Sequence, residues 1–307
     1  RDGKVIKALA QTTKTGLTFL LNRETGEPIF PVEEKKVPQG AIEGDYVSKT
    51  QPFPSKPAPL NPIYFDPNEA FGFTFWDRGY CKRTAKKLRN EGLFTPPSLQ
   101  GSIHYPSGVG GNNWGGPAID PERNIMIVNT NNMASLIVMV PREDCTKSLE
   151  ELSINKNQVR FTNIESNEGA PYCNLRSMGF FSPLGVPCTK PPWGTLTAID
   201  LNTGEHLWNV PLGTSKDLAP FPFWWIKGSP NMGGPTVTAS GVTFIGATSD
   251  HYLRAFNTET GEEIAKFRLP TGAHATPMTY TNKEGKQFVV IAAGGHWAIG
   301  TPASDHL

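Results

Sequence analysis

The chain has 307 residues, and its 31 glycines, 28 prolines and 37% hydrophobic residues are typical of a turn-rich protein rather than a helical one. A charged fraction of 19% and a formal net charge of +1 give no electrostatic footprint for nucleic acid or an anionic membrane, so partners of that class are not expected. No window approaches the roughly 20 consecutive apolar residues that a membrane-spanning helix needs, so no transmembrane segment is expected.

The N-terminal residues predict three strands. Val5–Thr12 and Gly16–Asn22 are strand-like runs on either side of a polar turn, and a second turn at Arg23–Gly26 leads into a third run at Glu27–Val32. The chain begins inside this periodic pattern without an initiator methionine and stops just after a glycine-rich turn. We therefore expect it to be a piece of a longer protein.

Two long insertions interrupt the strand pattern, at 33–111 and 142–192. The first contains the proline-rich stretches PVEEKKVPQG and QPFPSKPAPLNP, with helices expected near Asn68–Gly72 and at Tyr80–Asn90. Loops of this length inside a compact domain are usually lids, packed excursions or assembly surfaces. We expect both insertions to be ordered but irregular.

Two phrases recur along the chain. The first is a strand, then Asp or Asn, a Thr-Gly-Glu turn and another strand, and it occurs as GLTFLLNRETGEPIF at 16–30, GTLTAIDLNTGEHLW at 194–208 and HYLRAFNTETGEEIA at 251–265. The second occurs as GGPAIDPERNIMIVNT at 115–130 and GGPTVTASGVTFIGAT at 233–248. Such repetition predicts an architecture built from repeated units. Because Asp200 of one copy is Asn in the other two, we expect turn roles for Asp120, Asp200 and Asp250.

A complete unit lies between residues 231 and 269. It predicts strands at Thr236–Ala239, Val242–Ala247, Tyr252–Asn257 and Glu262–Leu269, and the pattern restarts at Thr276, with a following strand at Gln287–Ala293. Four antiparallel strands repeated radially form one blade of a β-propeller. The sequence therefore predicts an all-β propeller fold, of which this chain supplies roughly three to four blades.

The blade-like units are expected at 1–32, 115–212, 233–269 and 275–307, within one domain that spans 1–307. A propeller closes as a ring, so an arc of blades exposes two β faces and unpaired strand edges. We expect the remaining blades, or a second copy of the chain, to cover them.

The four cysteines have no Cys-x-x-Cys or Cys/His metal spacing, and they allow three disulfide pairings. They are Cys81, Cys145, Cys173 and Cys188. An even number of cysteines in a loop-rich β chain favours an oxidising compartment.

Other common chemistries lack their motifs. The sequence has no Gly-x-Gly-x-x-Gly after a strand, no P-loop, no Gly-x-Ser-x-Gly and no His-Glu-x-x-His, which disfavours nicotinamide, P-loop, serine-hydrolase and zinc-protease chemistry. The aromatic run at 221–225 lacks nearby basic residues and is expected to cover a blade or to form an interface.

The repeated phrases, with GGNNWGG, SPLGVPC, PPWGTLTAIDLNTGE and ATPMTYTNKEGKQFVVIAAGGH, resemble the pyrroloquinoline quinone (PQQ) dependent dehydrogenases, above all the membrane-bound glucose and quinate type. The resemblance covers nearly the whole chain. It implies an eight-bladed propeller with PQQ at its axis, one Ca²⁺ bound to the cofactor, and oxidation of a sugar, polyol or cyclitol alcohol with electron transfer to ubiquinone. It also implies a membrane-anchored parent protein on the periplasmic side of the bacterial inner membrane, of which this chain is the C-terminal part of the catalytic domain.

Cofactor-side residues follow from this resemblance where the motifs match. Lys14, in QTTKTG, matches a cation placed against the reactive quinone oxygens, where an ammonium stabilises negative charge developing during hydride transfer. The alternative is a solvated turn lysine. Asn113, in GGNNWGG, matches an asparagine that contacts PQQ, and the alternative is an asparagine in a left-handed turn. Trp114 is grouped with these residues, with packing as its alternative.

His296, in AAGGHWAIG, matches a histidine beside the cofactor, where an imidazole can donate to a carboxylate or quinone oxygen. Trp297 departs from the small residue expected after it. Met232 lies where some relatives place an aromatic residue near PQQ, and its alternative is filling a gap in the core. Three polar residues at a strand end are further substrate-side candidates: Asn129, Thr130 and Asn131.

No catalytic base and no metal ligand can be assigned within the chain. The resemblance places the general base, an Asp, and the Ca²⁺ ligands before Arg1, so the chain alone is expected to be inactive. The alternative function is a non-catalytic propeller that acts as a scaffold of the bacterial envelope. Such a scaffold would have no reason to carry Lys14, Asn113 and His296, so PQQ binding separates the two hypotheses.

Overall fold

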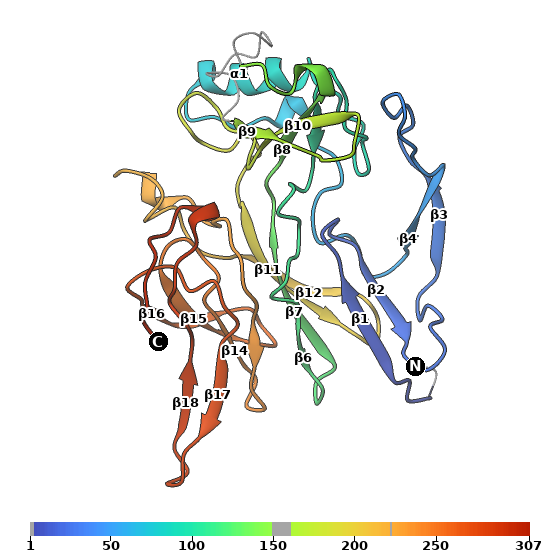
Figure 1. Ribbon diagram of the computed structural model, residues 1–307. Helices are drawn as coiled ribbons and strands as arrows, with labels where there is room; N and C mark the ends of the chain where they lie inside the picture. The colour runs from blue at the N-terminus through green and yellow to red at the C-terminus, as the bar shows by residue number, and fades with distance from the viewer. Residues whose placement is uncertain (1–2, 149–160, 222) are drawn as a thin grey trace.

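The computed structural model describes residues 3–148, 161–221 and 223–307 and shows a structure built mainly of strands (Figure 1). The strands are β1 (Ala8–Thr12), β2 (Thr18–Asn22), β3 (Val32–Lys36), β4 (Thr50–Pro54), β5 (Ser102–His104), β6 (Ala118–Asp120), β7 (Ile125–Asn131), β8 (Ser135–Pro141), β9 (Phe161–Glu165), β10 (Tyr172–Ser177), β11 (Gly194–Asp200), β12 (His206–Pro211), β13 (Thr236–Val237), β14 (Val242–Ile245), β15 (Tyr252–Asn257), β16 (Glu263–Arg268), β17 (Met278–Thr281) and β18 (Gln287–Val290). The helical elements are α1 (Phe75–Ala85) and the short 3-10 turns η1 (Pro67–Glu69), η2 (Arg142–Asp144), η3 (Phe223–Trp225) and η4 (Trp297–Ile299). The predicted all-β class is confirmed.

Two four-stranded antiparallel sheets form the centre of the molecule. Their strand orders are β6-β7-β11-β12 and β13-β14-β15-β16, and they lie side by side in Figure 1. In the first sheet the chain leaves after β7 and returns on β11, with Asn131 opposite Gly194 and Ile125 opposite Asp200. The second sheet contains the four strands predicted for the complete unit.

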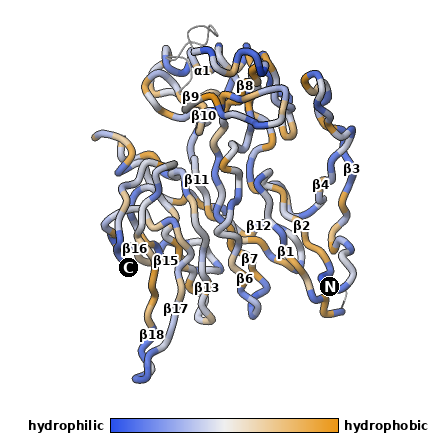
Figure 2. The backbone as a smooth tube through the Cα atoms, viewed as in Figure 1, coloured by the Kyte–Doolittle hydropathy of each residue, from blue (hydrophilic) through white to orange (hydrophobic). Residues whose placement is uncertain are grey.

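The burial pattern explains which strands are central. Every residue of β7 is buried, as are nearly all of β11, whereas the outer strand β12 alternates between half-buried and exposed positions. A strand covered on both faces needs apolar or internally bonded residues throughout, while an outer strand keeps only one side packed. Figure 2 shows that the tips of several hairpins, such as that of β17 and β18, are hydrophilic.

The Thr-Gly-Glu turns interlock neighbouring sheets. The glycine of each turn has a positive φ, and a Cβ at Gly261 would lie 2.7 Å from Cδ2 of Trp208, which ends the preceding copy of the phrase. The Trp208 indole also donates from Nε1 to the carbonyl of Thr258 at 3.1 Å. A Cβ at Gly204 would likewise lie 3.1 Å from the ring of Phe30, the last residue of the first copy. The final aromatic ring of each of the first two copies therefore packs on the glycine of the next copy.

The Gly-Gly-Pro phrases mark the closest approach of the two central sheets. A Cβ at Gly115 would lie 2.0 Å from the backbone of Gly233, and one at Gly234 would lie 2.2 Å from the carbonyl oxygen of Gly115. Only glycine permits backbone contact at this distance. These glycines precede β6 and β13, which contact each other.

The insertions are more regular than predicted. Strands β8, β9 and β10 join β5 in a four-stranded sheet, which packs with α1 at one end of the molecule, at the top of Figure 1. The cysteines pair as Cys81 with Cys188 and Cys145 with Cys173. The first bond ties α1 to the segment before β11, and the second ties the end of η2 to β10. Both bonds therefore secure the inserted sheet.

Helix α1 begins before the predicted position. Thr74 caps it by accepting a hydrogen bond from the amide of Asp77 at 3.1 Å, and the Asp77 carboxylate accepts from the amide of Phe73 at 3.1 Å. This reciprocal cap defines the helix start. The helix predicted near Asn68–Gly72 is the 3-10 turn η1.

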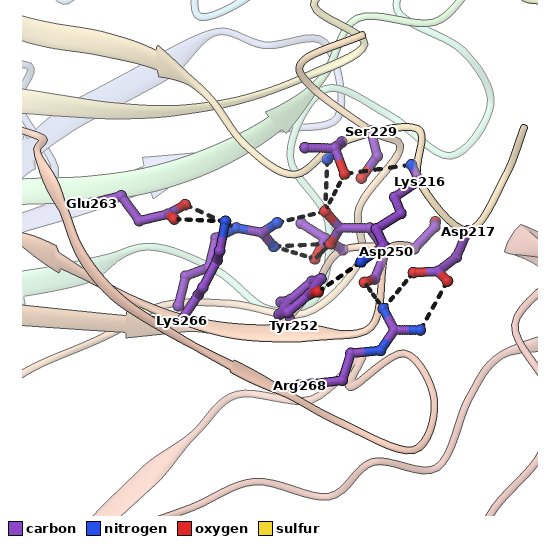
Figure 3. Close-up of polar contacts among 12 residues, drawn as sticks. Lys216, Asp217, Ser229, Asp250, Tyr252, Glu263, Lys266 and Arg268 are labelled. Atoms are coloured by element: carbon purple, nitrogen blue, oxygen red, sulfur yellow. Dashed lines mark hydrogen bonds and ion pairs between the residues drawn. The ribbon is translucent and has the colours of Figure 1, made fainter. Parts of the chain in front are cut away.

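A buried ion pair fixes the turn before β15. The side chains of Asp250 and Arg254 are both almost fully buried, and Arg254 donates to both carboxylate oxygens of Asp250 (Figure 3). The amide and hydroxyl of Thr214 also donate to Asp250, each at 2.8 Å. Asp250 therefore does more than the predicted turn role, because it also forms a buried ion pair with Arg254. By contrast, Asp120 and Asp200 accept bonds from amides two residues further along, which confirms their turn roles.

Among the residues that the structure describes, no helix is long and apolar enough to cross a membrane.

Candidate functional site

Lys14 lies in the turn between β1 and β2. The turn closes with a hydrogen bond from the amide of Gly16 to the carbonyl of Thr13 at 3.0 Å. The carbonyl of Lys14 accepts from the amide of Gly111 at 2.8 Å, and its Nζ lies 3.4 Å from the carbonyl oxygen of Gly108. Lys14 is thus attached to the loop at 107–116, which contains the GGNNWGG motif. Its ammonium makes one long contact with that loop and keeps further donor capacity.

The loop at 107–116 is ordered by its own hydrogen bonds. The Asn113 amide donates to the carbonyl of Val109 at 2.8 Å and its Oδ1 accepts from the amide of Trp114 at 2.9 Å. Asn113 does not have a positive φ, so the left-handed alternative considered for it is wrong. Its side chain is half-buried. Asn113 therefore shapes the loop that joins Lys14 to Trp114.

His296 lies between two indole rings. Its ring centroid is 5.8 Å from that of Trp114 and 6.0 Å from that of Trp297, which is stacked at 19°. Trp114 is 61% exposed and Trp297 is 82% exposed, whereas His296 is half-buried. The exposure of Trp114 disfavours the packing alternative. The arrangement presents flat aromatic surface at the end of the loop at 107–116.

A second histidine supports the turn that carries His296. The amide of His296 donates to Oγ1 of Thr301 at 2.7 Å, and this hydroxyl lies 3.0 Å from Nε2 of His274. His274 Nδ1 lies 3.0 Å from the carbonyl oxygen of Ala247, which can only accept, so Nδ1 is the protonated nitrogen and Nε2 accepts from Thr301. Burial lowers the pKa of His274 to about 4, and its ring is therefore neutral near pH 7.

His274 was not predicted as a site residue. The sequence feature that could have indicated it is the similarity between Gly272-Ala273-His274 and Gly294-Gly295-His296, because both turns lead into a histidine. The two rings lie 6.3 Å apart.

Met232 and the strand-end residues are buried. Met232 is 5% exposed, which favours its gap-filling alternative. The Asn129 amide donates to Asn231 Oδ1 at 2.7 Å, and Asn131 exchanges two bonds with the backbone of Asn231, each at 2.8 Å. Asn129, Thr130 and Asn131 are each at most 5% exposed. These residues join the two central sheets, and Asn131 also lines a cavity of about 430 Å³ together with Ser107 and Val109.

A cavity of about 480 Å³ borders Lys14. Polar lining groups include Tyr46, His104 and Ser107, and residues 92–97 form a further part of the lining. Burial lowers the pKa of His104, so its ring is neutral near pH 7. Neutral hydrogen-bonding groups beside one ammonium suit a small ligand with several hydroxyl groups.

The structure brings the predicted residues together in two linked groups. Lys14 contacts the loop at 107–116, which carries Asn113 and Trp114. The ring of Trp114 in turn contacts that of His296. Met232 is a core residue. Within the described ranges no three His, Cys, Asp or Glu side chains gather as metal ligands.

Radially neighbouring four-stranded sheets, with interlocked aromatic and glycine positions, define a β-propeller, and the site lies where their glycine-rich loops meet. Residues 1–289 match the family model described as the glucose/ethanol/alcohol dehydrogenase β-propeller domain, whose short name is PQQ. The chain belongs to this family.

Relatives span several dehydrogenases. The chain is 39% identical to the quinoprotein glucose dehydrogenase of Escherichia coli K12. The similarity covers 100% of this chain and 38% of that protein. It is 37% identical to the quinate/shikimate dehydrogenase (quinone) of Acinetobacter baylyi, over 96% of this chain and 37% of the relative. It is also 37% identical to the glycerol dehydrogenase large subunit of Gluconobacter thailandicus, covering 43% of it. The chain therefore spans less than half the length of these relatives.

Solved structures share the fold. A europium-containing methanol dehydrogenase superposes with a TM-score of 0.53 at 19% identity, over 96% of this chain and 38% of that one. The quinohemoprotein alcohol dehydrogenase of Comamonas testosteroni gives a TM-score of 0.52 at 23% identity, over 95% of this chain and 32% of that one.

Proposed function

We propose that this chain forms one side of the PQQ site of a dehydrogenase that oxidises a sugar, polyol or cyclitol alcohol and passes electrons to ubiquinone. The observation that carries the proposal is the continuous connection from Lys14 through the loop at 107–116 to the ring pair of Trp114 and His296. The proposal also places the protein on the periplasmic side of the bacterial inner membrane.

The residues present fit such a cofactor. PQQ is a flat, anionic ortho-quinone, and the site offers one ammonium, one amide and an exposed aromatic surface at the end of an ordered loop. When bound, the quinone accepts the hydride of the substrate alcohol. Lys14 would hold the quinone oxygens and stabilise their negative charge, since a fixed cation there costs no reorganisation during the reaction. Trp114 would stack on the ring, and Asn113 would keep Trp114 in place.

The other parts of the catalytic centre belong to residues outside this chain in our proposal. These are the general base, the Ca²⁺ ligands and the remaining blades, which would cover the open side of the arc. The chain alone should then bind PQQ more weakly than the longer protein and should not turn over substrate.

An activity assay tests this proposal. We expect the longer protein, loaded with PQQ and Ca²⁺, to reduce a ubiquinone analogue with glucose or quinate as the donor, and the isolated 307-residue chain to show no turnover. Turnover by the isolated chain would refute the assignment of the base to another segment. A longer protein that binds no PQQ at micromolar concentration would favour the non-catalytic scaffold.

A further inference from the structure

The segment from Thr214 to Lys227 is a closed loop that projects from the sheets (Figure 1, orange). Its two ends pair with each other at Thr214 and Lys227, and the amide of Ser215 donates to the carbonyl of Ile226 at 3.0 Å. The carbonyl of Ser215 accepts from the amides of Leu218 and Ala219. Backbone hydrogen bonds therefore close the two ends of the loop and its first turn.

This loop sorts its apolar side chains into an inner and an outer set. Phe223 stacks on Phe73 with ring centroids 4.3 Å apart, and Ile226 is 2% exposed. The outer set consists of Leu218 (44% exposed), Phe221 (76%), Trp224 (44%) and Trp225 (71%). The inner residues anchor the loop, while the outer side chains remain exposed.

Basic residues lie at both ends of the loop and around Tyr252 of β15. Lys216 and Lys227 lie at the two ends of the loop and are exposed, so the expectation that this aromatic run lacks nearby cations is wrong. Lys216 donates to the hydroxyl of Tyr252 at 3.2 Å, and Arg268 and Lys266 lie 5.0 and 5.7 Å from the centroid of the same ring (Figure 3).

Acidic neighbours compensate this charge only in part. Asp217 binds the guanidinium of Arg268, and Glu263 lies 3.8 Å from the ammonium of Lys266. The exposed cations beside the loop therefore outnumber the exposed carboxylates. A net charge near zero for the whole chain hides this local excess.

A cavity of about 430 Å³ connects the inner side of the loop to the candidate site. It is lined by Leu218 and Pro220 of the loop, by the buried Trp193, and by Ser107 and Val109 of the loop at 107–116. The inner side of the loop therefore borders the candidate site, and the lining does not include the exposed rings of Phe221, Trp224 and Trp225.

We propose that the segment at 216–227 is a membrane-contact element, which inserts Phe221, Trp224 and Trp225 into the interface of an anionic phospholipid bilayer. Aromatic rings with flanking lysines partition to the boundary between head groups and acyl chains, and each basic residue near an anionic surface adds attraction. The partner is a lipid surface because rings at the tip of a projecting loop, bordered by cations, suit a fluid interface. A protein interface of comparable strength is usually broader and depleted of lysine.

Vesicle flotation tests this assignment. The purified protein should float with vesicles of phosphatidylcholine and phosphatidylglycerol, and the double variant Phe221→Ser/Trp225→Ser should bind them about tenfold more weakly, because two exposed rings lose their burial in the interface. The double variant Lys216→Gln/Lys227→Gln should lose several-fold affinity for these vesicles while its weaker binding to pure phosphatidylcholine stays unchanged.

Tyr280→Ser is the matched control, because Tyr280 is 46% exposed on the distant hairpin of β17 and β18. It should bind vesicles as the wild type does, and unchanged thermal unfolding of all variants excludes misfolding. Absence of vesicle binding, or equal binding by the Phe221/Trp225 variant, would overturn the proposal. A wild-type dimer that dissociates in the same variant would overturn it in favour of a protein interface. None of these outcomes depends on PQQ.

Discussion

The imidazole of His296 lies 5.8 Å from the indole of Trp114, although one follows the last hairpin of the chain and the other precedes the β6-β7-β11-β12 sheet. This contact joins two loops that local sequence patterns treat as separate. It also creates the exposed aromatic surface on which the proposed cofactor would stack.

Replacing Trp114 should weaken PQQ binding without affecting stability. Trp114→Ala removes a 61% exposed ring, so folding should not change, but the loss of stacking should reduce PQQ affinity by about tenfold. Trp76→Ala is the control, because Trp76 is 69% exposed on α1. Fluorescence titration with PQQ measures both affinities, and equal losses in the two variants would contradict the stacking role.

The interlocking of neighbouring sheets predicts different effects for equivalent glycines. Gly261→Ala should destabilise the protein by about 2–4 kcal/mol, because it adds a clash with Trp208 to the strain of a positive φ. Gly26→Ala has the same φ strain with no atom within 4 Å, so it should cost about 1–2 kcal/mol. Urea unfolding measures the difference. Equal losses would show that the contact between sheets contributes nothing beyond backbone strain.

Stability should depend on pH through His274. Its folded pKa is lowered to about 4 by burial, whereas an unfolded histidine titrates near 6.5. The unfolded state therefore binds more protons between these values, so stability is complete above about pH 6.5 and falls as the pH drops toward 4, by about 2–3 kcal/mol in total. His274→Gln should show a flatter profile over this range. A wild-type stability that rises on acidification would contradict the neutral tautomer.

The two disulfides should contribute unequally. Cys81–Cys188 closes a separation of 107 residues and Cys145–Cys173 one of 28, so loop entropy predicts losses of about 5 and about 3.5 kcal/mol for the paired Cys→Ala variants. Thermal unfolding of the two double variants tests the order. A larger loss for Cys145/Cys173 would mean that the inserted sheet does not depend on its connection to α1.

The repeated units were predictable because their determinants are local. The Thr-Gly-Glu turns and alternating runs define hairpins within a few residues, and the strands β13 to β16 lie where these patterns predict them. Strands β9 and β10 were missed because β10 pairs with β8 across a long insertion and β9 pairs only with β10. The helix predicted at Tyr80–Asn90 is α1, at Phe75–Ala85; its start was missed because it is set by the cap that Thr74 forms with the amide of Asp77.

The site was predictable in composition but not in arrangement. Motifs pointed to Lys14, Asn113 and His296, yet the contact of Lys14 with Gly111 is a backbone bond between distant loops, which no sequence spacing encodes. The burial of Met232 likewise depends on the packing of neighbouring sheets.

The most direct test of the central claim is the affinity of the protein for PQQ with and without Lys14. Lys14→Gln should bind PQQ at least tenfold more weakly than the wild type, because it removes the ammonium that contacts the loop at 107–116. Lys7→Gln should bind as the wild type does, since Lys7 is exposed and pairs with Glu24. Equal PQQ affinities for Lys14→Gln and wild type would contradict the assignment.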